Sequence, residues 1–351
     1  MSRPEGDAGT ICFASSPKCN PLKYFVPQTS SLFAGIFLSH RHFRTPGSSP
    51  SFSYGSSLPS TAPALTSLVV LAGGMGSRFG GLKQLEPVGP SGEVLLDYAV
   101  FDAEQAGIGR VVFVIRPEMA ETFPAWADAR FGRRVEVRCA LQRIDEATVE
   151  PPPGRSKPWG TAHAVLTAAA LVDGPAVIVN ADDFYGRQGY EVLVRALERP
   201  GGGSPATWHL AAWPLGRTLS PSGAVNRALC DVDEQGWLRG LEEAAGLSAG
   251  TVPADQLAHL ASMNMWGFTP RIFDACSRAL GTFFRVADLT RDECLLPDVV
   301  REAIAAGEAR VKVHAMQSTW CGVTHPADVP ATRATLAALH RTGHYPAQLW
   351  P

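Results

Sequence analysis

The sequence lacks two features that would each indicate a particular class of protein. It has no excess of positive charge, since 31 Lys and Arg residues stand against 33 Asp and Glu residues for a formal net charge of -2. Nucleic-acid binding normally requires a basic face, so nucleic acid is not an expected partner. The longest apolar run near the N-terminus, residues 32–38, is far shorter than the roughly 18 residues of a membrane span. We therefore expect no membrane partner either.

Cysteine is scarce and irregularly placed. The chain has seven cysteines, an odd number, and no two of them form a C-x-x-C pair. This distribution argues against a disulfide framework and against a zinc site. It fits a reducing compartment, and we expect a cytoplasmic protein.

Acidic residues are missing from a long N-terminal stretch, with none between Asp7 and Glu86. Residues 1–65 are instead rich in Ser, Pro and Phe and do not resemble a packed domain. Three interpretations remain open for this extension: a disordered tail, an organellar transit peptide, and translated sequence upstream of the true start. We expect the folded chain to span residues 66–351.

From residue 66 onward, short apolar stretches alternate with helix-like segments. The expected strands cover residues 67–71, 111–115, 135–140, 176–180, 208–213, 228–232 and 309–316. The expected helices cover residues 93–106, 119–131, 161–171, 187–198, 271–280, 293–306 and 327–340. This alternation predicts an α/β fold, a Rossmann-like three-layer sandwich with a mostly parallel, mixed sheet.

The most informative segment, LAGGMGSRFGGLKQLEPVG, spans residues 71–89 and directly follows the first expected strand. Its glycines let backbone amides approach an anion closely, and Arg78 and Lys83 add positive charge. A P-loop is excluded because Leu82 stands where lysine should follow the second glycine. The dinucleotide fingerprint is excluded because Phe79 stands at the third glycine position. The segment is interpreted as a triphosphate cradle, the alternative being a plain turn between strand and helix.

LAGGMGSR followed by KQLEPVG resembles the signature L-A-G-G-x-G-x-R and then K-x-x-x-P of the sugar-phosphate nucleotidyltransferases, the NDP-sugar pyrophosphorylases. The resemblance implies their nucleotide-diphospho-sugar transferase fold, with a nucleotide-binding half at residues 66–186 and a sugar-binding half with C-terminal helices at 187–351. It also implies that Arg78 contacts the departing pyrophosphate and that Lys83 contacts phosphate near the reacting centre. The nucleotide contacts that it implies in this loop are Leu71, Ala72, Gly73, Gly74, Gly76 and Ser77.

A second motif, KPWGTAHAV at residues 157–165, resembles the base-recognition turn of the same family. Gly160 would let the base lie flat against the backbone, and Thr161 could hydrogen-bond its edge. Alternatively, Gly160 simply opens the helix that follows. Pro158 replaces the glutamine usual in the uridylyltransferase branch, so the identity of the base stays open. His163, a lone histidine in an apolar helix, is expected to be structural.

Adjacent carboxylates end the strand in VIVNADDFYG, residues 177–186. In open α/β sheets this position faces the ligand crevice. The family places there the aspartate that holds the catalytic Mg²⁺, so the resemblance implies Asp182 as the metal ligand. Alignment on the FYG that follows leaves Asp183 as the alternative. A turn or a helix cap is the alternative without a metal.

Three later segments match the family less closely. VDEQGWLRGLEE resembles its hairpin ending in an acidic residue near the sugar, which nominates Glu242, and SMNMWGFTPRIF resembles the strand that closes the sugar pocket, which nominates Asn264. TWCGVTHPAD stands where many members have a second metal-binding aspartate, but here Cys321 and Gly322 occupy that place. Asp328 could substitute, or it could lie at a helix N-terminus.

Together the motifs predict a magnesium-dependent enzyme that condenses a nucleoside triphosphate with a sugar 1-phosphate to give an NDP-sugar and pyrophosphate. In-line attack by a phosphate oxygen, already an anion, requires alignment and charge neutralisation rather than a general base. Two alternatives stay open. One is transfer to another phosphorylated acceptor, such as phosphocholine or a molybdopterin. The other is a catalytically weak nucleotide-binding regulatory protein.

Overall fold

The structure is a computed structural model that describes residues 65–74, 85–145, 149–198, 203–220, 222–323 and 326–350. The extension predicted for residues 1–65 lies outside these ranges except for its last residue. Across the described ranges, no helix combines the length and apolar character needed to cross a membrane.

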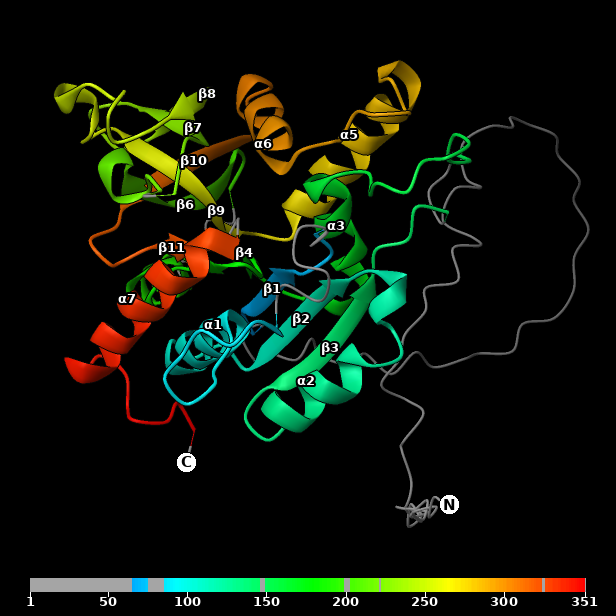
Figure 1. Cartoon of the computed structure of the whole chain (residues 1–351). Coiled ribbons are helices and arrows are strands. Elements are labelled where there is room, and N and C mark those ends of the chain that lie inside the picture. Colours follow the sequence, from blue (N-terminus) through cyan, green and yellow to red (C-terminus); the bar gives the residue numbers. More distant parts are fainter. Residues whose placement is uncertain are drawn as a thin grey trace, which may run out of the picture.

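The centre of the fold is a mixed sheet in which parallel pairing predominates (Figure 1). The strands are β1 (Ser67–Leu71), β2 (Arg110–Ile115), β3 (Glu136–Leu141), β4 (Ala176–Asn180), β5 (Asp183–Phe184), β6 (Ala206–Pro214), β7 (Val225–Val232), β8 (Leu238–Leu247), β9 (Leu260–Phe268), β10 (Ala309–Ala315) and β11 (Cys321–Gly322). The main path runs β10-β6-β9-β4-β1-β2-β3. β1 is parallel to β2 and β4, β2 to β3, and β6 to β10, whereas β9 runs antiparallel to β4 and β6. The predicted mixed, mostly parallel sheet is confirmed.

Helices cover both faces of this sheet, which gives the three layers expected from the sequence. They are α1 (Leu95–Gln105), α2 (Phe123–Phe131), α3 (Thr161–Thr167), α4 (Arg187–Leu197), α5 (Arg271–Val286), α6 (Leu296–Ala305) and α7 (Val329–Arg341). Neighbouring residues of β1 point to opposite faces: Val69 packs with α3, α5 and α6, while Leu68 and Val70 pack with α1, α2 and α4. Figure 1 shows α3, α5 and α6 on one side of the strands and α1 and α2 on the other. A strand buried on both faces explains why SLVVL is a continuous apolar run.

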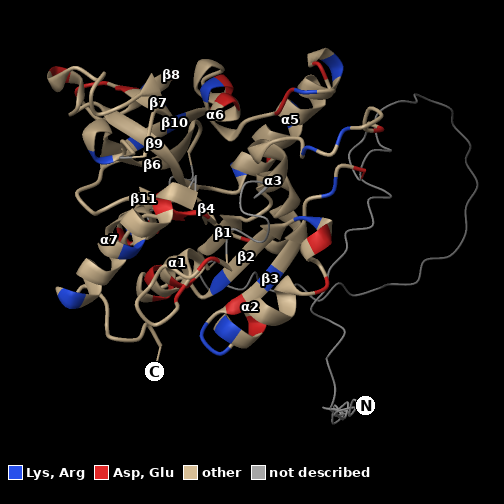
Figure 2. Cartoon of the chain, in the orientation of Figure 1, with Lys and Arg blue, Asp and Glu red and all other residues tan. Residues whose placement is uncertain are grey.

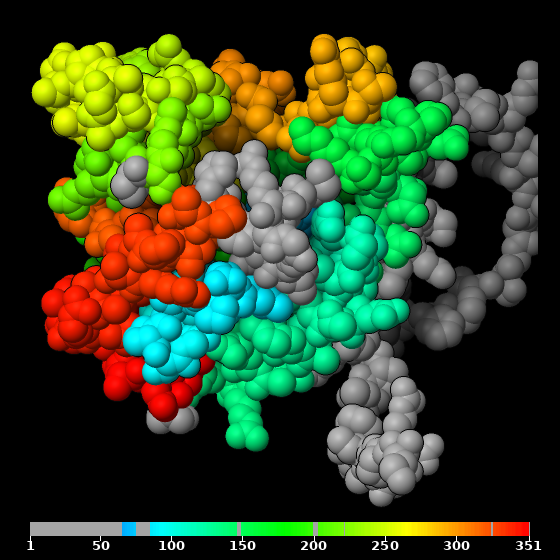
Figure 3. Space-filling model, in the orientation of Figure 1, coloured from blue at the N-terminus to red at the C-terminus, as the bar shows by residue number. Residues whose placement is uncertain are grey.

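The C-terminal segment forms a third apolar cluster outside α1. The ring of Tyr98 on α1 meets Phe184 and Tyr345 edge to face, with centroid distances of 5.7 and 5.2 Å. Arg333 on α7 donates from Nε to the carbonyl oxygen of Pro87 at 3.0 Å. Figure 3 shows α7, in red-orange, lying against the cyan residues around Pro87 and α1. The C-terminal helix therefore fixes the segment that follows the glycine loop.

Element boundaries differ from the expected ones where proline or pairing decides them. The helix expected at 119–131 begins at Phe123 with Pro124 in its first turn, and the helix expected at 293–306 begins at Leu296 with Pro297 in its first turn. Proline favours the first helical turn because its missing N–H has no partner there. β8 was expected only as one arm of a hairpin; its sequence, LRGLEEAAGL, mixes leucines with charged and small residues, and it pairs with β7 alone. Charged residues of both signs are mixed along the described elements in the view of Figure 2.

Candidate active site

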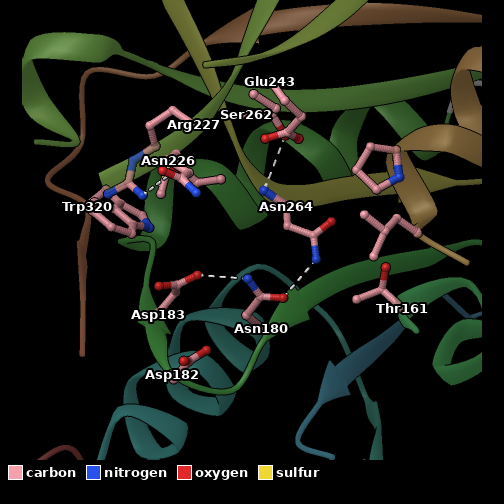
Figure 4. A pocket seen from close by; sticks show the side chains of 14 residues that line it. Thr161, Asn180, Asp182, Asp183, Asn226, Arg227, Glu243, Ser262, Asn264 and Trp320 are labelled. Carbon is pink, nitrogen blue, oxygen red and sulfur yellow. Dashed lines mark hydrogen bonds between the residues drawn. The ribbon is translucent and has the colours of Figure 1, made fainter. Parts of the chain in front are cut away.

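A cavity of about 330 Å³ opens where the sheet changes direction, at the carboxyl end of β4 between parallel β1 and antiparallel β9. Open α/β sheets bind ligands at such a switch point. The turn after β4, strands β7, β8 and β9, the segment before α6 and the residue before β11 contribute to its wall. The polar residues of that wall are Thr161, Asn180, Asp182, Asp183, Asn226, Arg227, Glu243, Ser262 and Asn264, together with Trp320 (Figure 4).

The two adjacent carboxylates differ in environment. Asp182, the predicted metal ligand, is half-buried and lines the cavity. Asp183 is buried, and its Oδ2 accepts hydrogen bonds from Asn180 Nδ2 at 2.9 Å and from the Tyr185 hydroxyl at 3.1 Å. Burial, and then the negative charge of Asp182, raise the pKa of the Asp183 carboxyl above its usual range. Asp183 is thus held inside the fold, while Asp182 is the more accessible carboxylate.

Asn264 lies in the cavity wall, where the resemblance places a sugar contact. Its Nδ2 donates to Asn180 Oδ1 at 2.8 Å and its Oδ1 accepts from Trp266 Nε1 at 2.8 Å. Its backbone has φ +61°, a left-handed conformation that asparagine adopts more readily than most residues. The strand register between β6 and β9 shifts nearby, between Ala211 and Ala212. The irregular strand turns the Asn264 amide towards the cavity and Asn180 (Figure 4).

The acidic residue that the β8 hairpin presents to the cavity is Glu243, the neighbour of the residue nominated from the sequence. Glu243 pairs with Ala228 on β7, and both line the cavity. Glu242 pairs with Leu229 and is not among the lining residues. Because adjacent residues of a strand face opposite sides, one step in register decides which carboxylate faces the cavity. A role for Glu242 at the sugar stays a prediction.

The glycine segment begins where β1 ends. Ala72 donates from its backbone N–H to the carbonyl oxygen of Val114 at 2.9 Å, which continues the strand pairing past Leu71. A Cβ on Gly73 would lie 2.7 Å from Gln142 Oε1, so the backbone passes very close to that amide, while Gly74 is exposed. Residues 75–84 lie outside the described ranges, and with them four residues assigned from the sequence: Gly76, Ser77, Arg78 and Lys83. Their roles stay predictions.

Gly160 opens α3, as the alternative interpretation expected, and it also has a packing role. Its φ is +106°, and a Cβ there would overlap the carbonyl oxygen of Cys294 and lie 2.8 Å from its nitrogen. Thr161 Oγ1 accepts a hydrogen bond from the backbone N–H of Leu296 at 2.8 Å. Thr161 lines the cavity with Leu295. The turn therefore joins the segment before α6 to the cavity, and base recognition by Gly160 and Thr161 stays a prediction.

Arg155 holds this wall in place. Its guanidinium donates to four carbonyl oxygens, those of Lys157, Pro158, Leu289 and Asp292, at 2.6–2.9 Å. It also lies over the ring of Trp159, 4.0 Å from the ring centroid. The sequence analysis did not single out this residue. Its only local signal is its position two residues before KPWG.

The segment TWCGV packs directly against the carboxylate pair. Strand β11 pairs antiparallel with β5, with Gly322 opposite Asp183. A Cβ on Gly322 would lie 2.5 Å from Asp183 Oδ1, so the Asp183 carboxylate fills the space of a side chain at 322. Asp328 is the N-cap residue of α7, accepts from Ser220 Oγ at 3.2 Å, and does not line this cavity. No cluster of three or more potential metal-binding side chains occurs among the described residues.

Residues that were not found from the sequence include Asn180, Arg227 and Trp320 in the cavity wall and Gln142 beside it. Gln142 is buried and donates from Nε2 to the carbonyl oxygen of Gly160 at 3.0 Å. Arg227 is the one positively charged side chain among the described residues that line the cavity. His163 is half-buried beside Gln142, and burial lowers the pKa of its ring to about 4, which fits the expected structural role.

Comparisons with known proteins bear on part of the sequence and on the overall fold. Residues 68–209 match the family model of the MobA-like NTP transferase domain. The fold is similar to a structure assigned as a glucose-1-phosphate thymidylyltransferase from Bacillus anthracis, with a TM-score of 0.53 and 13% identity over 78% of this chain and 95% of that one. It is also similar to the inositol-1-phosphate CTP transferase from T. maritima, with a TM-score of 0.53 and 17% identity over 78% of this chain and 96% of that one. A comparison with curated proteins found no match.

Proposed function

We propose that this protein is a nucleotidyltransferase of the MobA-like type that transfers a nucleotidyl group from a nucleoside triphosphate to a sugar 1-phosphate and releases pyrophosphate. The observation that carries the proposal is the position of Asp182. Its carboxylate lines a cavity at the carboxyl end of β4, next to the strand that leads into the glycine loop. The matched residues 68–209 include the glycine loop, the KPWGTAHAV turn and both carboxylates.

The carboxylates suit a hard divalent cation such as Mg²⁺, which prefers oxygen ligands and keeps several waters. Asp182 would hold it from the cavity wall, with the Asp183 carboxylate behind. When bound, this ion supplies charge neutralisation for the reacting phosphates. Among the described residues the set of possible ligands is small, which fits a metal that is held partly by substrate phosphates.

The chain's own residues align the two substrates. In the proposed arrangement the triphosphate lies along the glycine loop, with Arg78 and Lys83 at the departing pyrophosphate. An oxygen of the sugar phosphate attacks the α-phosphorus, a new P–O bond forms, and the bond to the β-phosphate oxygen breaks on the opposite side. The attacking oxygen is an anion, so proton transfer is not needed. Asn264 and Glu243 stand across the cavity from Asp182, where they can contact sugar hydroxyls (Figure 4).

Gln142 supports a nucleotide on the β1 side of this cavity. It lies between Gly73 and Gly160, the two segments that the resemblance assigns to the nucleotide. Its amide is polar on both edges and buried, which suits hydrogen bonding to the edge of a base. We include Gln142 among the nucleotide contacts that we propose.

A matrix of reactions tests the proposal. Every mixture contains Mg²⁺, one nucleoside triphosphate and one acceptor, and pyrophosphate release is measured. The nucleoside triphosphates are ATP, CTP, GTP, UTP and dTTP. The acceptors are α-D-glucose 1-phosphate, N-acetylglucosamine 1-phosphate, inositol 1-phosphate and phosphocholine. We expect release that requires both substrates and is fastest with a sugar 1-phosphate. Release only in the mixtures that contain phosphocholine would show that the acceptor belongs to another chemical class. Nucleotide binding without release in any combination would favour the regulatory alternative.

A further inference from the structure

A second cavity, of about 800 Å³, lies beside the active-site cavity. It is enclosed by residues 217–220 and 222–227, before and at the start of β7, by β11 and by the first turns of α7. The two cavities share three residues, Asn226, Arg227 and Trp320. Ligand-binding pockets typically measure roughly 300–1,000 Å³, so each cavity has the size of a ligand site. A ligand in the first cavity that extends past these three residues would enter the second.

Arg227 is fixed at the junction. Its Nη1 donates to the carbonyl oxygen of Asn226 at 2.9 Å, and its Nε and Nη2 both donate to the carbonyl oxygen of Thr218. The guanidinium lies over the Trp320 ring, 5.1 Å from the centroid. A guanidinium has five N–H donors, so these three bonds leave two for a ligand. Figure 4 shows Arg227 and Trp320 together at one end of the first cavity.

The junction also has the indole N–H of Trp320 as a hydrogen-bond donor and the guanidinium of Arg227 as a positive charge. Among the described residues, the buried Trp320 Nε1 has no hydrogen-bond partner. Asp183, in the first cavity, and Asp328, in the second, both raise the pKa of Arg227, although burial lowers it by more. Arg227 therefore lies between a carboxylate in each cavity. With its charge compensated by these carboxylates and two N–H donors left, Arg227 suits a polar, uncharged group at the junction.

The wall of the second cavity carries hydroxyl groups together with Arg217, whose Nη1 donates to the carbonyl oxygen of Gln317, and the junction residue Arg227. Ser220, Ser222, Thr332 and Thr335 line it, and the buried Asp328 carboxylate accepts a hydrogen bond from Ser220. Hydroxyls both donate and accept, and a carboxylate accepts, which matches an uncharged group rich in hydroxyls. A buried carboxylate in the same wall disfavours a polyphosphate. The indole face of Trp320 adds an apolar surface at the entrance.

We propose that the second cavity binds the distal, hydroxyl-rich part of the acceptor, so that the enzyme prefers an oligosaccharide 1-phosphate of at least two sugar units to a monosaccharide 1-phosphate. The inference rests on the proposed function and names its acceptor class. In this arrangement the first sugar unit lies between Asn264 and Glu243 with its phosphate towards Asp182. The second unit passes Arg227 and Trp320 at the junction to contact Ser222 and Asp328.

Calorimetric titration tests the inference by comparing the affinity for two disaccharide phosphates, maltose 1-phosphate and cellobiose 1-phosphate, with that for α-D-glucose 1-phosphate. Ala331 is exposed on α7 and lines the second cavity, so Ala331→Trp fills that cavity without touching the first. Ala334 is exposed on the same helix and lines neither cavity, so Ala334→Trp is the matched control. Thermal unfolding of both variants checks that each is folded.

We expect the wild-type protein to bind at least one disaccharide phosphate about tenfold or more tightly than glucose 1-phosphate, a difference of roughly 1.4 kcal/mol. Ala331→Trp should abolish this advantage while glucose 1-phosphate binds as before, and Ala334→Trp should behave as the wild type. Equal wild-type affinities, or an advantage that survives Ala331→Trp, would overturn the inference. If the inference is overturned but glucose 1-phosphate still supports pyrophosphate release, the proposed function holds without the inference. If none of the three phosphates binds, the proposed function fails together with the inference.

Discussion

The side-chain amide of Gln142 donates a hydrogen bond to the carbonyl oxygen of Gly160 at 3.0 Å. Gln142 follows β3, and Gly160 is 18 residues further along, at the start of α3. On its other edge the same amide lies against Gly73, at the end of β1. One buried glutamine thus connects the glycine loop with the KPWGTAHAV turn.

Replacing this glutamine should impair nucleotide binding selectively. Gln142→Ala removes the bridge and one of the two hydrogen bonds that the Gly160 carbonyl accepts, the other coming from the Ala164 N–H, which costs roughly 0.5–1.5 kcal/mol. We expect the KM for the nucleotide to rise about tenfold or more, with little change in the KM for the acceptor. Gln235→Ala, in the exposed turn between β7 and β8, is the control. Equal increases for both substrates would contradict a nucleotide-side role.

Gly160 should be required for folding as well as for any contact with the base. Gly160→Ala places a Cβ against the Cys294 backbone and strains a left-handed conformation. We expect a loss of roughly 2–4 kcal/mol in the free energy of unfolding, measured with urea. Gly154→Ala is the control, because Gly154 has φ +83° but nothing within 4 Å of an added Cβ. Its loss should be only about 1 kcal/mol, from strain alone. Similar losses for the two variants would show that crowding at Cys294 is unimportant.

Substitutions in the carboxylate pair should show which carboxylate is needed for catalysis. Asp182→Asn keeps the size of the side chain and removes the charge, so kcat should fall by roughly two to four orders of magnitude with the fold retained. Asp183→Asn should cost much less, because an amide oxygen can still accept from Asn180 and Tyr185. Kinetics over a Mg²⁺ titration measures both. The reverse ranking would make Asp183 the metal ligand.

Arg155 should stabilise the cavity wall. Arg155→Ala leaves four carbonyl oxygens without their donor and removes the contact with Trp159, so we expect a loss of roughly 2–4 kcal/mol in the free energy of unfolding. Arg291 lies in the loop between α5 and α6 that Arg155 contacts, but it forms exposed ion pairs. Arg291→Ala should therefore cost less than about 0.5 kcal/mol. Urea unfolding that gave Arg155→Ala an equally small loss would show that the clamp is not needed.

Asp102 should make stability fall as the pH rises. Burial raises the pKa of its carboxyl from 3.8 to about 7, although Tyr345 donates a hydrogen bond to it and Arg187 lies 3.5 Å away. Between about pH 4 and pH 7 the folded chain keeps a proton that the unfolded chain has released, so the free energy of unfolding falls with pH across this window. Asp102→Asn should remove on the order of 2–4 kcal/mol of that fall.

The measurement for Asp102 is chemical unfolding at a series of pH values, compared between the wild type and Asp102→Asn. Glu121→Gln, which removes an exposed carboxylate, is the control and should follow the wild-type curve. A wild-type curve parallel to that of Asp102→Asn over the whole window would show that the carboxyl is already ionised at pH 4.

The sequence predicted the parts of the fold that depend on local pattern. SLVVL and AVIVN are continuous apolar runs because both faces of β1 and β4 are buried, and such runs can be identified without a structure. β8 was not predicted in this way, because LRGLEEAAGL is not a continuous apolar run and only its pairing with β7 makes it a strand. The choice between Glu242 and Glu243 depends on register, which two adjacent carboxylates do not reveal.

The site was predictable where one segment carries a motif and not where distant segments meet. NADD could be recognised because the strand end and its carboxylates are adjacent in the chain. Arg227 and Gln142 carry no motif, and each gains its meaning from partners such as Trp320 and Gly160 that only the fold brings close. The reason for the glycine at 160 was likewise hidden, since Cys294 lies 134 residues away in the sequence.

Direct observation of the products tests the central claim, nucleotidyl transfer to a sugar 1-phosphate. A mixture of the most active nucleoside triphosphate and sugar 1-phosphate with Mg²⁺ is followed by ³¹P nuclear magnetic resonance, with Asp182→Asn as the matched inactive variant. The account predicts that resonances of a diphosphate diester and of pyrophosphate grow together in equal amounts with the wild-type protein and are nearly absent with Asp182→Asn. Hydrolysis of the triphosphate without diester formation, or equal diester formation by the two proteins, would contradict it.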